Sequence, residues 1–101
     1  MINGPMWILQ NAQEPSELVF RLSPGSVKTI GRATGADLIL DAALVSRVHC
    51  RLEANSETLE VIDLESTNGI YVNGDRVRRA HLIPGDTLKV GRVELSVGRT
   101  A

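Results

Sequence analysis

Four short segments of this chain carry side chains that could hold an anionic group and the backbone of an extended peptide. They are Gly31-Arg32, Ser46-Arg47-Val48-His49, Ser66-Thr67-Asn68-Gly69 and Asn73-Gly74. Arginine presents a planar fork of donors that suits phosphate oxygens, and hydroxyl and backbone N–H groups can donate to the same oxygens. Each segment falls at a predicted turn or strand end, so loops could bring them together. The pattern indicates a binding site.

The Gly31-Arg32 pair is predicted to end a strand whose inward residue is Ile30. Glycine lets the backbone turn there without a Cβ clash, so the next side chain projects from the rim of the sheet. Arg32 could then fork onto a phosphate. Taken alone, Gly-Arg is a weak signal, since an arginine at the rim is more commonly just solvated.

The Ser46-Arg47-Val48-His49 segment gives a stronger signal. Val45 and Val48 are expected to pack inward and fix the loop, which leaves Ser46 and Arg47 pointing outward before a strand. His49 could contact a ligand or support the loop. We favour support, with a neutral imidazole bonded to neighbouring loop backbone.

Turn chemistry dominates the other two segments. Asn tolerates left-handed backbone geometry and Gly adopts it freely, so Asn68-Gly69 predicts a tight turn. The hydroxyls of Ser66 and Thr67 could simply bond local backbone. Asn73-Gly74-Asp75 is assigned to a hairpin, with no direct role in binding.

Catalytic and metal-binding alternatives find little support. Ser46, His49 and either Asp63 or Asp86 are the ingredients of a hydrolase triad, but Ser46 lies too close to His49 in the chain for that geometry. No Gly-x-Ser-x-Gly elbow, phosphate-binding glycine loop or dinucleotide fingerprint is present. The histidines are isolated, with no zinc-site spacing. We therefore expect a protein that is not an enzyme and needs no metal or cofactor.

The elements that must position these residues are strands. Apolar and polar residues alternate, as one-sided burial in an antiparallel sheet requires, and turn residues separate the runs. Many short strands indicate an all-β sandwich or barrel, and the pattern alone does not choose between them. The predicted strands are 5–10, 17–22, 27–31, 37–40, 48–54, 58–63, 69–72, 76–78, 86–90 and 92–98. Residues 11–16 are expected to form a polar loop, and 99–101 a frayed end.

Composition limits the number of domains, the kinds of partner and the cellular setting that the chain can have. The chain has 101 residues, 43% of them hydrophobic and only 3% aromatic, which predicts one domain over 1–101 with an aliphatic core. A net charge of −1 argues against a protein that coats nucleic acid. One cysteine, Cys50, allows no internal disulfide. With no secretory leader and no apolar run of ~20 residues, the expected setting is soluble and intracellular, cytoplasmic by default and away from membranes.

In motif order, loop spacing and strand pattern, residues 30–97 resemble the forkhead-associated (FHA) domain. The resemblance implies an FHA/SMAD-like β-sandwich of two antiparallel sheets, about eleven short strands in all. It also implies a signalling adaptor whose loops at one end bind a phosphothreonine peptide, the product of a Ser/Thr kinase. The positions that match phosphate-binding residues are Arg32, Ser46, Arg47 and Thr67. Asn68 matches the residue that grips the peptide backbone, and the positions that shape the loops are Gly31, His49 and Gly69.

Minor departures and one alternative remain. Ala36 stands where the family often has Asn ahead of an Asp-hydrophobic pair, here Asp37-Leu38. Selectivity for flanking residues is expected from the segment 34–43 and from a loop around Arg76-Val77-Arg78-Arg79. The same sandwich could instead bind a protein without reading phosphate, or form a homodimer, through a sheet face or an unpaired edge. The sequence leaves the oligomeric state open.

Overall fold

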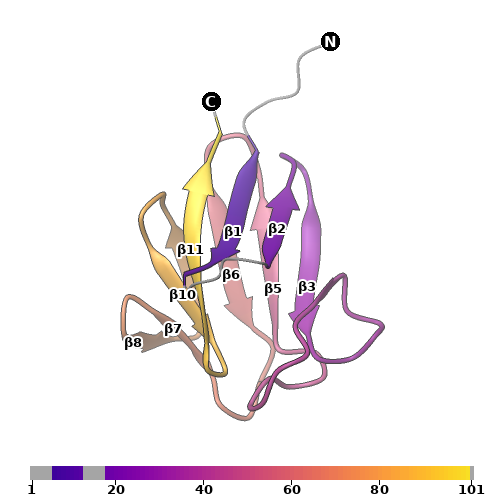
Figure 1. Cartoon of the computed structure of the whole chain (residues 1–101). Coiled ribbons are helices and arrows are strands. Elements are labelled where there is room, and N and C mark those ends of the chain that lie inside the picture. Colours follow the sequence, from indigo (N-terminus) through magenta and orange to yellow (C-terminus); the bar gives the residue numbers. More distant parts are fainter. Residues whose placement is uncertain (1–5, 13–17, 101) are drawn as a thin grey trace.

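The computed structural model describes residues 6–12 and 18–100, which form two β-sheets packed face to face (Figure 1). The first sheet has the strand order β2-β1-β11-β10-β7-β8, and the second has the order β4-β3-β5-β6-β9. The first-sheet strands are β1 (Trp7–Asn11), β2 (Val19–Leu22), β7 (Ile70–Val72), β8 (Asp75–Val77), β10 (Thr87–Val90) and β11 (Val93–Arg99). The second-sheet strands are β3 (Val27–Gly31), β4 (Leu38–Ile39), β5 (Cys50–Ala54), β6 (Leu59–Asp63) and β9 (Arg79–Leu82).

Alternating burial explains why these segments form strands. In β5, residues 50, 52 and 54 are buried while 51 and 53 are partly exposed, so one face meets the core. Pairing is antiparallel throughout both sheets except between β3 and β4, which run parallel with Ile30 opposite Leu38. The expected β-sandwich is confirmed, and the barrel left open by the strand pattern is excluded.

Each of the ten predicted ranges overlaps an observed strand, but one strand was missed. The strand pattern predicted one strand over 76–78 and none between there and 86, whereas β8 ends at Val77 and β9 begins at Arg79. Only Arg78 separates the two strands, with none of the Gly, Pro or Asn that usually mark a turn. At this position the chain crosses from one sheet to the other.

The chain end is also more ordered than expected. Arg99 closes β11, and the Thr100 N–H donates to the Met6 carbonyl at 2.9 Å. The Met6 N–H in turn donates to the Thr100 hydroxyl at 3.0 Å. Residues 5, 13–17 and 101, which the predicted strands, loop and tail include, lie outside the described residues.

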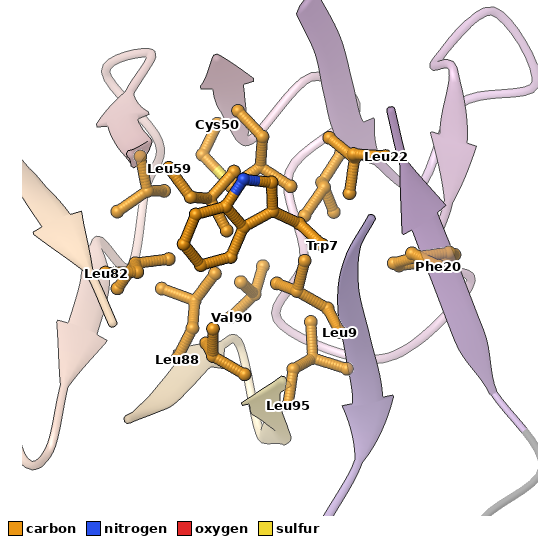
Figure 2. Packing of buried hydrophobic residues seen from close by; sticks show 14 of the residues in the cluster. Trp7, Leu9, Phe20, Leu22, Cys50, Leu59, Leu82, Leu88, Val90 and Leu95 are labelled. Carbon is orange, nitrogen blue, oxygen red and sulfur yellow. The ribbon is translucent and has the colours of Figure 1, made fainter. Parts of the chain in front are cut away.

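The core between the sheets is aliphatic around one aromatic residue. Figure 2 shows the Trp7 indole amid leucine and valine side chains from both sheets. Trp7 is 1% exposed, and its Nε1–H donates to the Asn55 carbonyl at 2.9 Å, so its polar atom is satisfied. The Arg99 guanidinium lies 4.7 Å from the ring centroid. Within 6–12 and 18–100, no helix is long and apolar enough to cross a membrane.

Cys50 is fully buried, and its thiol is expected to be inert. Burial first, and the Asp63 carboxylate second, raise the pKa of this thiol to about 12. At pH 8, iodoacetamide should therefore alkylate the unfolded chain rapidly and the folded chain only through unfolding. Because only the unfolded thiol ionises from about pH 9, the folded state should lose stability as the pH rises from there toward 12. Fast labelling of the native protein, measured by mass spectrometry, would contradict this burial.

Candidate functional site

Three of the four polar segments meet at one end of the sandwich, opposite the end where Met6 and Thr100 lie side by side. We call the β3–β4, β4–β5 and β6–β7 connections the first, second and third connections. All three emerge at the lower end of Figure 1. They contain, respectively, Arg32, the pair Ser46 and Arg47, and the pair Thr67 and Asn68. The topology thus brings together all of the residues expected to contact a ligand.

Gly31 allows two of these connections to touch. A Cβ at Gly31 would lie 2.8 Å from the Arg47 carbonyl carbon, 2.9 Å from the Val48 Cα, and closer still to the Arg47 carbonyl oxygen. With no Cβ there, the Arg32 N–H donates to the Ser46 carbonyl at 2.9 Å and the Ala33 N–H donates to the Arg47 carbonyl at 3.1 Å. The end of β3 and residues 46–47 therefore run side by side.

The Arg32 side chain is oriented by the neighbouring connection. Its Nε donates to the Val45 carbonyl at 3.1 Å, and Val45 itself is 3% exposed. Within residues 6–12 and 18–100, the two terminal guanidinium nitrogens have no hydrogen-bond or ion-pair partner. The guanidinium is thus aimed by one bond and keeps its terminal donors for another group.

His49 links the second connection to the third. It is fully buried, the Ser46 N–H donates to its Nδ1 at 3.0 Å, and its Nε2 lies 2.8 Å from the Gly69 carbonyl. Because Nδ1 accepts a hydrogen bond, the ring proton sits on Nε2 and donates to Gly69, and the imidazole is neutral. With both nitrogens bonded to backbone, His49 is not placed to take a proton from the Ser46 hydroxyl.

The hydroxyl of Ser46 and the amide of Asn68 complete the links. The Thr67 N–H donates to Ser46 Oγ at 3.2 Å, and Asn68 Nδ2 donates to the Leu44 carbonyl at 3.0 Å. Leu44 has a φ of 70°, an unusual conformation for a residue with a Cβ. The second and third connections are therefore joined by three hydrogen bonds that involve side chains, and also by the backbone bond from the Leu64 N–H to the His49 carbonyl at 3.0 Å.

The turn at 66–69 is held by its own polar side chains, as its residue types predict. Ser66 Oγ donates to Asp63 Oδ1 at 2.5 Å and accepts from the Gly69 N–H at 2.8 Å. Gly69 has a φ of +78°, the left-handed geometry that the Asn-Gly pair indicated. Ser66 is thus committed to the turn, whereas Thr67 is exposed.

Two predictions near the site were wrong. Val48 was expected to pack inward, but it is 46% exposed. Strand β5 begins only at Cys50, so Val48 and His49 lie before the pleat and do not follow its alternation. The basic run 76–79 is not a loop, and Arg79 is engaged in a forked pair with Glu60 at 2.9 and 3.2 Å. That pair lowers the pKa of Glu60.

Sequence reasoning missed several supporting groups. The backbone carbonyls of Leu44 and Val45 carry no side-chain signal, and the Asp63–Ser66 spacing was not singled out. Gly91, in the β10–β11 turn, lies against the second connection, where an added Cβ would be 2.9 Å from Val45 Cγ2 and 3.0 Å from the Ala43 carbonyl oxygen. This contact joins distant parts of the chain, so only the fold could show it.

A family model described as "FHA domain" matches residues 28–91, which include every residue of the three segments. The chain belongs to the FHA family. The domain is also similar in sequence to curated proteins. It is 40% identical, over 80% of its length, to the ABC transporter ATP-binding/permease protein Rv1747 of Mycobacterium tuberculosis. It is 34% identical, over 69% of its length, to the glycogen accumulation regulator GarA of the same organism.

The aligned region spans 9% of Rv1747 and 43% of GarA, so this FHA domain covers less than half of either relative. Among solved structures, it resembles an FHA domain from a structural and functional analysis of phosphothreonine-dependent FHA domain interactions. The TM-score is 0.80 at 30% identity, covering 93% of this chain and 94% of the other. Both the fold and the family expected from the sequence are confirmed.

The first connection of this FHA domain is fixed by Asp37, next to the position where Ala36 departs from the family pattern. The Asp37 carboxylate accepts from the Thr29 N–H at 2.9 Å and from the Thr29 hydroxyl at 3.2 Å. These bonds, the backbone one foremost, hold the pKa of Asp37 below its usual value. Ala36 is 6% exposed, so it packs inward. The Asp37–Thr29 bonds tie the connection to β3 without help from position 36.

Proposed function

We propose that this FHA domain is a phosphothreonine-dependent peptide-binding module that acts as a signalling adaptor. The carrying observation is the convergence of Arg32, Ser46, Thr67 and Asn68 on three connections bonded to one another. The relatives support the proposal, since one is named a regulator and a similar FHA domain was studied for phosphothreonine-dependent interactions. The partner would be a protein phosphorylated on threonine by a Ser/Thr kinase.

Phosphate binding follows from the donors that remain free. A phosphothreonine carries about −1.5 to −2 charges at neutral pH and three strong acceptor oxygens. Arg32, already oriented through Nε, would donate its terminal nitrogens to two of those oxygens. Ser46 Oγ accepts from Thr67, so its own proton is free to donate to the third. Arg32 and Ser46 are both already held by hydrogen bonds, which limits the entropic cost of binding.

The other site residues would have supporting roles. Arg47 is exposed and adds a positive charge beside Ser46. The Thr67 side chain is exposed, and its hydroxyl would support the phosphate. Asn68 spends one amide hydrogen on Leu44, which leaves its second hydrogen and its carbonyl oxygen for the backbone of an extended peptide. Gly31, His49 and Gly69 would act indirectly, by holding the connections in place.

Phosphothreonine should bind more tightly than phosphoserine. A pocket that accepts the threonine methyl gains about 1–3 kcal/mol, so the preference should be roughly ten- to a hundredfold. We would titrate the protein calorimetrically with matched degenerate peptide pools centred on phosphothreonine, phosphoserine and plain threonine. Binding of the first pool alone, or far more tightly than the second, is the expected result. Equal affinity for all three pools would contradict phosphate reading.

The alternative, a phosphate-independent interaction or a homodimer, would use a different part of the sandwich. Strands β2 and β8 end one sheet, and β4 and β9 end the other, so edges for strand addition exist among the described residues. Such a function needs neither Arg32 nor the bonded connections. The site residues therefore favour phosphate reading.

A further inference from the structure

The three arginines at the β8–β9 corner differ in what they contact. Arg79 forms its forked pair with Glu60, so its charge is matched on the sheet face. Arg78 occupies the corner, and its carbonyl accepts from the Asp63 N–H at 2.7 Å. Arg76 instead extends its guanidinium across Gly69. An added Cβ at Gly69 would lie 2.5 to 2.9 Å from three guanidinium atoms, Nε, Cζ and Nη2.

This contact places Arg76 beside the peptide-binding edge of the site. Gly69 directly follows Asn68, whose amide is held by the Leu44 carbonyl, and lies two residues from Thr67, whose N–H is bonded to Ser46. Two residues of chain span at most about 7 Å. The Arg76 guanidinium therefore lies within a few residues' reach of a phosphate bound at Ser46.

The charge of Arg76 is unmatched inside the protein. Within the described parts of the chain, no carboxylate forms an ion pair with Arg76, and the residue is exposed. Arg79 differs from Arg76 in this respect, because Arg79 is already paired with the Glu60 carboxylate. A guanidinium that packs against a glycine and has no partner among the described residues is suited to a forked contact with an incoming carboxylate.

We infer that Arg76 is a specificity-determining residue that binds an acidic side chain flanking the phosphothreonine, an inference that rests on the proposed function. An extended peptide advances about 3.3 Å per residue, so the acidic residue should stand about two to four positions from the phosphothreonine. Gly69 is part of this arrangement, because any side chain there would displace the guanidinium. The pair would be exposed and therefore weakened by salt.

The test begins with the tightest phosphothreonine peptide from the pools. At each flanking position in turn, aspartate is compared with asparagine by calorimetry, using the wild-type domain and the variant Arg76→Gln. Arg78→Gln is the neighbouring control and Arg21→Gln, on the far edge strand β2, is the distant one. Thermal unfolding of each variant checks that the fold is kept.

One position is expected at which aspartate improves binding by about two- to fivefold over asparagine, as a favourable exposed pair allows. Arg76→Gln should abolish that preference and leave the asparagine peptide within about twofold of its wild-type affinity. Arg76→Glu should favour a lysine at the same position.

Other outcomes would overturn the inference. The inference fails if the wild type shows no preference for aspartate at any position. It also fails if Arg78→Gln or Arg21→Gln reduces the aspartate preference as much as Arg76→Gln does, because the preference would then reflect the overall positive charge of the domain. If Arg76→Gln weakened both peptides equally, its role would be structural. Each of these results leaves the proposed function standing. Failure of every phosphothreonine peptide to bind the wild type would instead overturn the proposed function, and the inference with it.

Discussion

Arg32→Ala is expected to weaken phosphothreonine-peptide binding by roughly 30- to 150-fold, about 2–3 kcal/mol. The side chain is aimed by its bond to the Val45 carbonyl, so its terminal donors are already placed for a forked, charge-assisted contact. Alanine removes the positive charge and the donors that the bond to Val45 holds in position. Calorimetric titration with a single phosphothreonine peptide measures the loss.

Arg47→Ala is the matched comparison, since it removes the same charge from the neighbouring connection. Both arginines are exposed, but the described residues offer the Arg47 guanidinium no orienting bond, so its loss should cost only about 0.2–1 kcal/mol, or up to about fivefold. Arg32→Lys keeps the charge without the fork and should fall between the two. Comparable losses of peptide affinity in Arg32→Ala and Arg47→Ala would contradict the assignment of Arg32 as the principal phosphate ligand.

Gly31→Ala is expected to abolish binding and to destabilise the whole domain. The new Cβ would overlap the backbone of Arg47 and Val48, which cannot move aside by rotating a side chain. The second connection would have to leave β3, breaking the bonds from Arg32 and Ala33 to its carbonyls. We expect a cost of about 3 kcal/mol or more, which lowers the unfolding temperature by about 10–20 °C.

Gly35→Ala is the control, because it adds the same methyl a few residues away in open space. No atom lies within 4 Å of a Cβ at Gly35, and its φ is not in the left-handed range. This variant should unfold within a few degrees of the wild type and bind the peptide normally. Thermal unfolding followed by circular dichroism compares the two variants. If Gly31→Ala unfolded and bound like Gly35→Ala, the close approach at Gly31 could not be essential.

Much of the fold could be read from local patterns. Alternation predicted segments such as β5 and β10 because each has one face in the core, and Asn-Gly pairs predicted the turns at 68–69 and 73–74. Strand β9 escaped because it follows β8 after one residue, with no turn signal between them. The strand pattern also did not predict the burial of His49, because strand alternation applies only from Cys50, where β5 begins.

The site could be predicted in residue type but not in connection. Motif spacing indicated Arg32, Ser46 and Asn68, yet their orientation depends on backbone carbonyls that no sequence pattern reveals. The bond from Asn68 to Leu44 spans 24 positions of the chain, and the contact of Gly91 with Val45 joins different sheets. Such contacts exist only once the sandwich has formed. The same holds for Arg76, which the sequence grouped with its neighbours and the structure separates from them.

The most direct test of phosphopeptide binding at the converged connections is a titration followed by ¹⁵N-resolved NMR. A phosphothreonine peptide is added to the labelled domain, and its unphosphorylated form serves as the control. We predict that the largest shifts fall on the Arg32 Nε–H and on the backbone amides of 31–33, 44–49 and 66–69, and only with the phosphorylated peptide. Shifts confined to an edge strand such as β2, or the same with both peptides, would contradict the account and favour the phosphate-independent surface.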